Sequence, residues 1–167
     1  MSGNTIGRVL CLTTFGESHG PAVGGILDGF PSNIPVNRLN IQNRLKRRFP
    51  KGLPGMTTRT EEDVIEWLSG IEDNYSTGGP IAFLVKNQNV KPVDYKNLKD
   101  VFRPSHADYT YFIKYDRQVG PGGGRSSGRE TVARIIGGEL SRILLTKLNT
   151  RVTACVISTG KVRLEIA

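Results

Sequence analysis

The segment GPGGGRSSGRE, residues 120–130, combines bare backbone with hydroxyl and guanidinium donors. Glycine allows positive φ angles and a close approach of a ligand to the main chain. Arg125 and Arg129 carry guanidinium groups suited to a phosphate, and the neighbouring serines add further donors. A helical pattern follows, so the N–H groups of a helix start would face the same ligand. The segment therefore predicts an anion site, with a flexible glycine-rich loop as the alternative.

The two histidines, His19 in GESHG and His106 in RPSHADYTY, are candidates for proton transfer. Both lie among polar residues in loop-like stretches, where catalytic groups are commonly found. Imidazole changes its charge near neutral pH, which suits a general acid or base. One histidine alone is more often structural, but two of them with a phosphate loop indicate proton transfer at or near a phosphate ester. If both act in one reaction, they must face one pocket rather than pack separately in the core.

A basic stretch, residues 29–60, contains no Asp or Glu but seven basic side chains: Arg38, Arg44, Lys46, Arg47, Arg48, Lys51 and Arg59. On a helix, Arg44 and Arg48 share one face while Ile41 and Leu45 lie on another. Such a face suits a polyanionic small ligand, and it suits nucleic acid equally well. A nucleic-acid-binding module that uses residues 38–51 is therefore the main alternative to an enzyme, and a solvated face without a ligand is the third interpretation.

Other chemistries fit less well. GESHG satisfies the letters of the G-x-S-x-G motif around Ser18, but a strand rather than a long helix follows it. A serine hydrolase is therefore a weaker alternative. The glycine-rich segment lacks the Gly-Lys-Ser/Thr ending of a P-loop. The histidines have no cysteine partners at metal-ligand spacing, so we expect no metal.

The composition is that of a globular protein. The 167 residues suffice for one domain with a core, and 37% of them are hydrophobic. The net charge of +8 predicts an acidic partner, namely nucleic acid, an anionic membrane surface or a phosphorylated metabolite. Cys11 and Cys155 are expected to be small buried thiols in a reducing compartment. Because no apolar run of membrane-spanning length and no secretory signal is visible, we expect a cytoplasmic protein.

Strands and a short helix are expected in the first half of the chain. Two strands, in TIGRVLCLTTFG and AVGGILDGF, flank the connection that carries His19. Asn37 is expected to cap a short helix that runs through residue 48. Alternating side chains over residues 64–68 favour a strand there, although residues 60–63 have the spacing of a helix capping box. The following STGGPIAFLV suits a hairpin.

Two helices and a last strand are expected in the second half. ADYTYFIKY predicts a short aromatic helix, and a long helix is expected from Arg129. The apolar positions of the long helix recur at helical spacing: Val132, Ile135, Ile136, Leu140, Ile143 and Leu144. VTACVIS, residues 152–158, is expected to be a strand. Because no further element closes the sheet edge, we expect a truncated chain, with residues 1–167 forming a single partial domain.

Three longer blocks together resemble the chorismate synthase family. GNTIGRVLCLTTFGESHGPAVGGILDGFP resembles the N-terminal signature of the family, DVFRPSHADYTYFIKYD its second histidine segment, and GGGRSSGRETVARIIGGEL its central signature. The resemblance implies a lyase of aromatic amino acid biosynthesis that converts 5-enolpyruvylshikimate 3-phosphate to chorismate. Phosphate leaves from C3 and a hydrogen from C6, in an anti-1,4 elimination. The resemblance also implies a need for reduced FMN, with NADPH as a candidate reductant.

The same resemblance implies roles for individual residues. His106 would protonate the departing phosphate, and His19 would act as an acid towards the reduced flavin. The implied FMN contacts are Arg125, Ser126 and Ser127. The implied ligands of the anionic substrate are Ser18, Arg48, Arg103 and Arg129.

The implied fold is α+β, with helices sandwiched between antiparallel sheets, in a homotetramer that binds a small molecule and neither nucleic acid nor a membrane. The chain would form about one half of such a β-α-β sandwich subunit, because family chains are roughly twice as long. Their second half supplies further FMN contacts and a carboxylate that works with the flavin. RRFPKGLPGMTTRTEED departs from the arginine-rich form of the family, with Pro54 where a substrate-contacting Arg is common.

Overall fold

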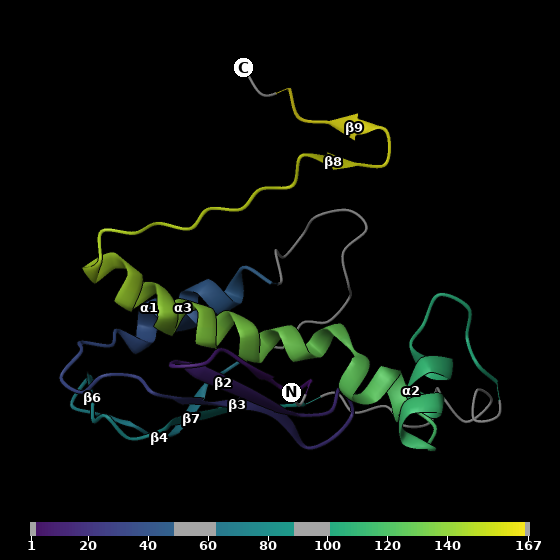
Figure 1. Ribbon diagram of the computed structural model, residues 1–167, viewed down its shortest axis with the longest axis horizontal. Helices are drawn as coiled ribbons and strands as arrows, with labels where there is room; N and C mark the ends of the chain where they lie inside the picture. Colours follow the sequence, from purple (N-terminus) through teal and green to yellow (C-terminus); the bar gives the residue numbers. More distant parts are fainter. Residues whose placement is uncertain (1–2, 49–62, 89–100, 166–167) are drawn as a thin grey trace.

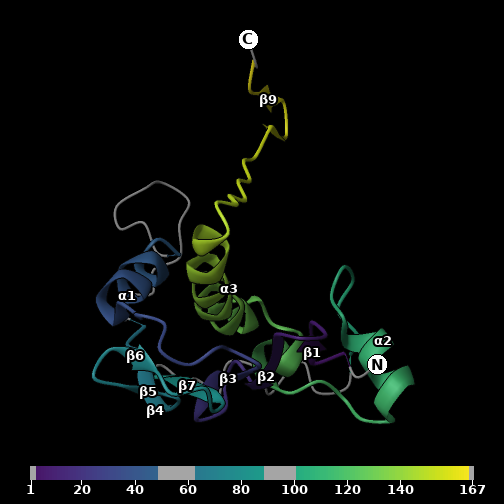
Figure 2. The ribbon, with the colours of Figure 1, turned by 60° about the vertical axis from the view of Figure 1, so that its left-hand side comes forward.

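A five-stranded antiparallel sheet forms the base of the structure, and two helices lie across one of its faces (Figures 1 and 2). The structure is a computed structural model that describes residues 3–48, 63–88 and 101–165. Neighbouring strands in this sheet are antiparallel throughout. In their order across the sheet, the strands are β1 (Thr5–Ile6), β2 (Cys11–Gly16), β3 (Ala22–Asp28), β7 (Ile81–Lys86) and β4 (Glu66–Ser69).

The β2–β3 hairpin forms as the sequence predicts. Its register pairs Cys11 with Asp28 and Gly16 with Val23, so residues 17–21 connect the two strands. Successive side chains along a strand point to opposite faces of the sheet. In β2 this alternation buries Leu12 and Thr14 on the helix side. The connection carries His19 at one end of the sheet, next to the strands that hold it.

Helices α1 (Arg38–Lys46) and α3 (Thr131–Lys147) cover the same face of the sheet (Figure 2). The side chain of Asn37 caps α1 by accepting a hydrogen bond from the N–H of Asn40 at 3.0 Å. Both predicted helices are confirmed. The long helix starts two residues later than expected, because a short 3₁₀ turn, η3 (Gly128–Glu130), precedes it.

The hydrophobic core lies between the sheet and these two helices. Phe83 in the centre of β7 is fully buried and packs edge-on against Trp67 of β4, with ring centroids 5.9 Å apart. Burying an apolar side chain of this size contributes about 1.5–3 kcal/mol. The helices add their apolar stripes to the same core: Ile41 and Leu45 from α1, and Val132, Ala133, Ile136 and Leu140 from α3.

The stretch before β7 forms strand β4, and the preference for a strand over a helix is confirmed. A tight hairpin follows, made of β5 (Ile71–Glu72) and β6 (Tyr75–Ser76). Its turn residues Asp73 and Asn74 have φ angles of 47° and 65°, which suit Asp and Asn in a two-residue hairpin loop. The hairpin expected in STGGPIAFLV thus forms earlier in the chain, with its turn at Asp73 and Asn74. Residues 77–80 then lead into β7.

The strand predicted over residues 152–158 is wrong. The structure shows no regular element over residues 151–157, and only the short pair β8 (Ser158–Thr159) and β9 (Val162–Arg163) follows. Figure 1 shows this segment standing away from the sheet and the helices. A β-rich sequence forms a strand only with a partner strand, and no strand in the described residues pairs with it. Cys155 is therefore exposed. Cys11 in β2 is half-buried, so neither thiol is buried as expected.

The aromatic stretch forms helix α2 (Asp108–Tyr115), as predicted. In Figures 1 and 2, α2 stands to one side of the layer formed by α1 and α3. The α+β class is confirmed, with the described residues supplying the large antiparallel sheet and the helices over it. Over residues 3–48, 63–88 and 101–165, no helix combines the length and apolar character needed to cross a lipid bilayer.

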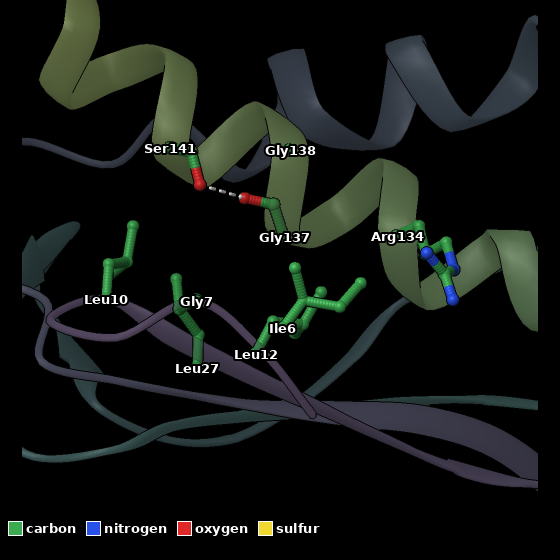
Figure 3. A pocket seen from close by; sticks show the side chains of 9 residues that line it. All are labelled: Ile6, Gly7, Leu10, Leu12, Leu27, Arg134, Gly137, Gly138 and Ser141. Carbon is green, nitrogen blue, oxygen red and sulfur yellow. Dashed lines mark hydrogen bonds between the residues drawn. The ribbon is translucent and has the colours of Figure 1, made fainter. Parts of the chain in front are cut away.

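Two adjacent glycines test how tightly α3 packs on the sheet. Gly137 and Gly138 border a groove of about 250 Å³ between α3, β1 and β2 (Figure 3). A methyl group added at Gly137 would lie 2.6 Å from Cδ2 of Leu12, whereas one at Gly138 would meet nothing within 4 Å. Either change to Ala gains the same helix propensity, about 1 kcal/mol. We expect Gly137→Ala to be less stable than Gly138→Ala by about 1–3 kcal/mol, the cost of overpacking.

Denaturant unfolding of the two variants measures this difference directly, because their helix propensities cancel. Equal free energies of unfolding would contradict the close contact between α3 and β2.

Candidate active site

The connection between β2 and β3 docks onto the glycine-rich segment. The N–H of Ser18 donates to the carbonyl oxygen of Gly124 at 3.2 Å. The Ser18 hydroxyl donates to the carbonyl oxygens of Pro121 and Gly122, at 3.1 and 3.2 Å. These bonds join residues more than one hundred positions apart in the sequence. Two segments that the sequence predicted to be functional therefore meet in the structure.

The glycine-rich segment has a defined shape. It forms the 3₁₀ turn η2 (Pro121–Ser126), within which Gly122, Gly123 and Gly124 have φ angles of 64°, 87° and 48°. Residues other than glycine rarely adopt positive φ angles of this kind. The glycines therefore maintain a particular backbone path. A merely flexible loop, the alternative from the sequence, does not describe this turn.

The ring of His19 lies against this turn. A β-carbon added at Gly122 would come within 2.4 Å of both Cδ2 and Nε2 of His19. Gly122 is thus required twice, for its positive φ and for the space that the imidazole occupies. The arrangement puts an imidazole directly beside the backbone turn that the sequence predicted to bind an anion.

Arg125 is directed towards the N-terminal strands. Its Nη2 donates to the carbonyl oxygen of Thr14 at 2.9 Å and also contacts the Thr14 hydroxyl. Its Nε donates to the side-chain oxygen of Asn4 at 3.2 Å. Its Nη1 is buried and has no hydrogen-bond partner in the part of the chain that the structure describes. An unpaired buried donor of this kind costs free energy and is where a ligand oxygen would be expected.

Glu130 lies next to Arg125 and is ionised. It accepts hydrogen bonds from the Thr14 hydroxyl at 2.9 Å and from Nε of Arg134 at 2.7 Å. Burial raises the pKa of the Glu130 carboxyl, but the hydrogen bonds from Arg134 and Thr14 and the charges of Arg134 and Arg125 outweigh it. The resulting pKa of Glu130 is below its ordinary value.

Asp63 brings two of the predicted substrate-binding arginines together. Arg129 is buried, and its Nη1 donates to Oδ1 of Asp63 at 2.5 Å. Arg48 lies just beyond α1, and its Nη1 pairs with the other carboxylate oxygen of Asp63 at 3.4 Å. Two guanidinium groups thus share one carboxylate, so these three side chains together carry one positive charge in excess. Such a cluster suits an anionic ligand.

Asn87 connects this arginine cluster to the connection that carries His19. Its side-chain oxygen accepts a hydrogen bond from Nε of Arg129 at 2.9 Å. Its amide nitrogen donates to the carbonyl oxygens of Glu17 and Gly20, at 2.9 and 2.7 Å. Ser18, His19, Arg48 and Arg129 therefore belong to one connected region.

The two predicted FMN-contacting serines differ in their surroundings. The Ser127 hydroxyl caps η3 by accepting a hydrogen bond from the N–H of Arg129 at 3.3 Å. Ser126 is exposed at the end of η2. Both follow Arg125 directly, so the three predicted residues line one short stretch of the turn.

The segment that carries Arg103 and His106 is held by contacts of its own. Arg103 donates three hydrogen bonds to Asp108: Nε to Oδ2 at 2.8 Å, Nη2 to Oδ1 at 2.9 Å, and its backbone N–H to Oδ2 at 3.1 Å. His106 is exposed, and its Nδ1 lies 3.0 Å from the carbonyl oxygen of Pro104. None of these bonds reaches the region around His19. A single pocket for both histidines therefore stays a prediction.

The alternatives from the sequence find little support in these contacts. Ser18 is 5% exposed, and its hydroxyl donates to main-chain oxygens, which does not suit a nucleophile. In the basic stretch, Arg38 donates to the carbonyl oxygen of Ile71, and Arg44 pairs with Glu139 of α3 at 3.7 Å. Lys51, Pro54 and Arg59 lie outside the described residues. Among residues 3–48, 63–88 and 101–165, no group of three acidic, His or Cys side chains is placed to bind a metal ion.

Comparison with known proteins decides the family. The family model described as chorismate synthase matches residues 10–167. The chain belongs to the chorismate synthase family. The chorismate synthase of Bacteroides thetaiotaomicron is 48% identical over 162 residues, which cover 97% of this chain and 45% of that protein. The chorismate synthase of Campylobacter curvus is 47% identical over 159 residues, which cover 95% of this chain and 45% of that protein.

A solved structure agrees with this assignment. A crystal structure of chorismate synthase matches with a TM-score of 0.60 and 29% sequence identity, over 85% of this chain and 36% of that chain. The resemblance predicted from the three sequence blocks is confirmed. The chain spans a little under half the length of the curated relatives that it matches.

Sequence analysis missed two residues of this candidate site. The sequence marks Asp63 only as the end of a possible capping box, and no motif in it includes Asn87. The relevant signal was weak, because each is a lone polar residue next to a strand. Their importance comes from Arg129, which lies 66 and 42 residues away in the sequence.

The buried pair between Asp63 and Arg129 is expected to dominate local stability. Removing one partner of a buried ion pair leaves an uncompensated charge and costs about 3–5 kcal/mol. We expect Asp63→Ala to lose about this much free energy of unfolding. Glu66→Ala is the matched control, because Glu66 pairs with Lys86 at 2.7 Å on the surface, where a pair contributes about 0–1 kcal/mol. Chemical denaturation of both variants makes the comparison, and equal losses would contradict the role of Asp63.

The Arg103–Asp108 pair predicts a pH dependence. Hydrogen bonding from the Arg103 side chain, opposed by burial and helped by the charges of Arg103 and His106, lowers the pKa of Asp108 from 3.8 to about 2. Because the folded-state pKa is lowered, the pair stabilises the fold fully above pH ~4, and this contribution is lost as the pH falls through about 2. Carboxyl NMR should show Asp108 titrating near 2, and near its ordinary value in Arg103→Gln. An unshifted Asp108 in the unmodified protein would argue against the pair.

Proposed function

We propose that the protein catalyses the elimination of phosphate from 5-enolpyruvylshikimate 3-phosphate to give chorismate. Membership of the chorismate synthase family supports this reaction class. The observation that carries the proposal is the contact of the His19 ring with Gly122 in the glycine-rich turn. Asn87 connects the residues on either side of Ser18 and His19 to Arg129, which shares Asp63 with Arg48. A proton-transferring group and a net positive cluster thus occur in one region, as elimination of a phosphate requires.

The substrate would be held by the arginine cluster. Arg48 and Arg129 are oriented by Asp63, and the positive charge in excess of that carboxylate would attract the anionic groups of the substrate. Ser18 lies in the same region, where its bonds to the glycine-rich turn keep the His19 connection in place. Arg103 completes the proposed set from the neighbouring segment, where Asp108 fixes the plane of its guanidinium group.

The glycine-rich turn fits the phosphate of FMN. The buried Nη1 of Arg125 has no partner among the described residues, Ser126 is exposed, and the three consecutive glycines have no side chains to fill the space beside the backbone. Arg125, Ser126 and Ser127 are therefore the residues that we propose to hold FMN. When bound, reduced FMN supplies electron density that assists departure of the phosphate. NADPH as its reductant, the homotetramer and the cytoplasmic location stay predictions.

His106 is the proposed acid for the leaving phosphate. A carbonyl oxygen only accepts hydrogen bonds, so the contact with Pro104 requires a hydrogen on Nδ1 of His106. The proton delivered to the phosphate would then come from Nε2 of the imidazolium ring. His19 would act as an acid at the flavin side, where its ring edge already lies against the turn that we propose to bind the cofactor. Both roles require the two segments to face one pocket in the assembled enzyme.

A turnover experiment tests the proposal. The natural full-length chain, supplied with reduced FMN and 5-enolpyruvylshikimate 3-phosphate without oxygen, should release phosphate and form chorismate. His106→Ala should lower kcat by about 10²–10⁴-fold, because a general acid is lost. Affinities for substrate and FMN should change far less, since the interaction is made mainly in the transition state.

Thr110→Ala is the control for this experiment. It removes a surface hydrogen bond to Ala107 from the same segment and should leave turnover intact. No chorismate from the unmodified protein would refute the proposed function. Full turnover by folded His106→Ala would refute the role of this histidine alone.

A further inference from the structure

Asn87 lies where three structural units meet. It follows β7 directly, and its N–H donates to the carbonyl oxygen of Pro21 at 3.0 Å, just before β3 begins. The register of the two strands, Ala22 opposite Lys86, puts Asn87 beside the end of the His19 connection. Its backbone thus continues the strand pairing by one further hydrogen bond. The sheet therefore fixes the position from which the Asn87 side chain extends.

The side chain of Asn87 makes three hydrogen bonds in two directions. Its amide nitrogen donates to the carbonyl oxygens of Glu17 and Gly20, the residues that flank Ser18 and His19. Its oxygen accepts from Nε of Arg129. The two carbonyls accept only and the guanidinium donates only, so the amide has a single orientation that satisfies all three partners.

Beyond the two strands and the backbone bond of Asn87 to Pro21, the His19 connection has two further anchors. On one side Ser18 binds the glycine-rich turn through its N–H and its hydroxyl. On the other side Asn87 holds the carbonyl oxygens of Glu17 and Gly20. Without the bonds from the Asn87 side chain, the carbonyl groups of Glu17 and Gly20 lose their partner, and the backbone between them can shift the ring of His19 relative to Arg129.

We propose that Asn87 is a positioning residue that sets His19 at a fixed distance from Arg129. The inference rests on the proposed function, in which Arg129 binds the substrate and His19 transfers a proton. Asn87 touches neither the reacting atoms nor a ligand in this account. It acts through the main chain of the His19 connection and through the guanidinium group of Arg129.

Asn87→Asp separates the two directions of this contact. The carboxylate still accepts from Arg129, but it has no donor for the carbonyl oxygens of Glu17 and Gly20, which it repels. In the natural full-length chain we expect kcat to fall by about 10–100-fold, the size of effect produced by a small misplacement of a catalytic group. The KM for 5-enolpyruvylshikimate 3-phosphate should rise as well, because the added carboxylate cancels the excess positive charge of Arg48, Asp63 and Arg129. The loss in kcat is therefore measured at saturating substrate. Asn87→Ala should lower kcat and also raise KM.

NMR of the imidazole groups supplies a measurement that does not depend on turnover. The ¹⁵N shifts and titration midpoint of His19, assigned by comparison with His19→Gln, should change in both Asn87 variants. Those of His106 in the neighbouring segment should not change. Ser76→Ala is the control, because the Ser76 hydroxyl also makes two hydrogen bonds, at 2.6 and 2.9 Å, but far from the site. It should lower stability without changing the His19 spectrum or kcat.

The outcomes separate this inference from the proposed function. If the unmodified protein forms no chorismate, the proposed function fails, and the His19 spectra still decide whether Asn87 positions that ring. An unchanged His19 spectrum in Asn87→Asp overturns the inference whatever the turnover shows. A changed spectrum with undiminished kcat in an active enzyme also overturns it. If Asn87→Ala does not fold, Asn87→Asp alone makes the comparison.

Discussion

The buried pair of Asp63 with Arg129 is the interaction on which the rest of the site depends. Each of these residues is 7% exposed, and a guanidinium group removed from water to that extent needs a paired carboxylate. Asp63 precedes β4, whereas Arg129 lies in η3, immediately before α3. The pair therefore joins the far edge of the sheet to the start of the longest helix. Arg48 joins the same carboxylate from the end of α1, so three distant segments converge on it.

The second constraint is steric and acts at the glycine-rich turn. Three consecutive positive φ angles give the backbone a path that residues with a β-carbon rarely follow. The same path brings Gly122 close enough to His19 that a methyl group there would overlap the ring. A glycine-rich sequence often indicates a flexible loop. Here the glycines instead allow the turn to pack closely against the ring of His19. This turn and the Asp63 pair hold opposite ends of one region, with Asn87 between them.

Several arginines of the chain are paired with carboxylates inside the fold. The net charge of +8 suggests a polyanionic partner when it is treated as a single quantity. In the structure, however, Arg44, Arg103 and Arg125 each pair with a carboxylate. The excess that matters for a ligand is local, where Arg48 and Arg129 share Asp63. That local excess is where we propose that the anionic substrate binds.

The sequence by itself determined the local elements and most of the candidate chemistry. The helix of residues 131–147, the cap of Asn37 and the hairpin around His19 follow from spacing between near neighbours, and three long blocks were sufficient to indicate the family. The strand predicted for residues 152–158 is wrong, because a strand forms only when it pairs with a neighbouring strand. The tertiary structure alone decided which groups meet. Asp63 and Asn87 gain their roles from a guanidinium group that lies 66 and 42 residues away, and a contact at that separation leaves no periodic pattern in a single chain.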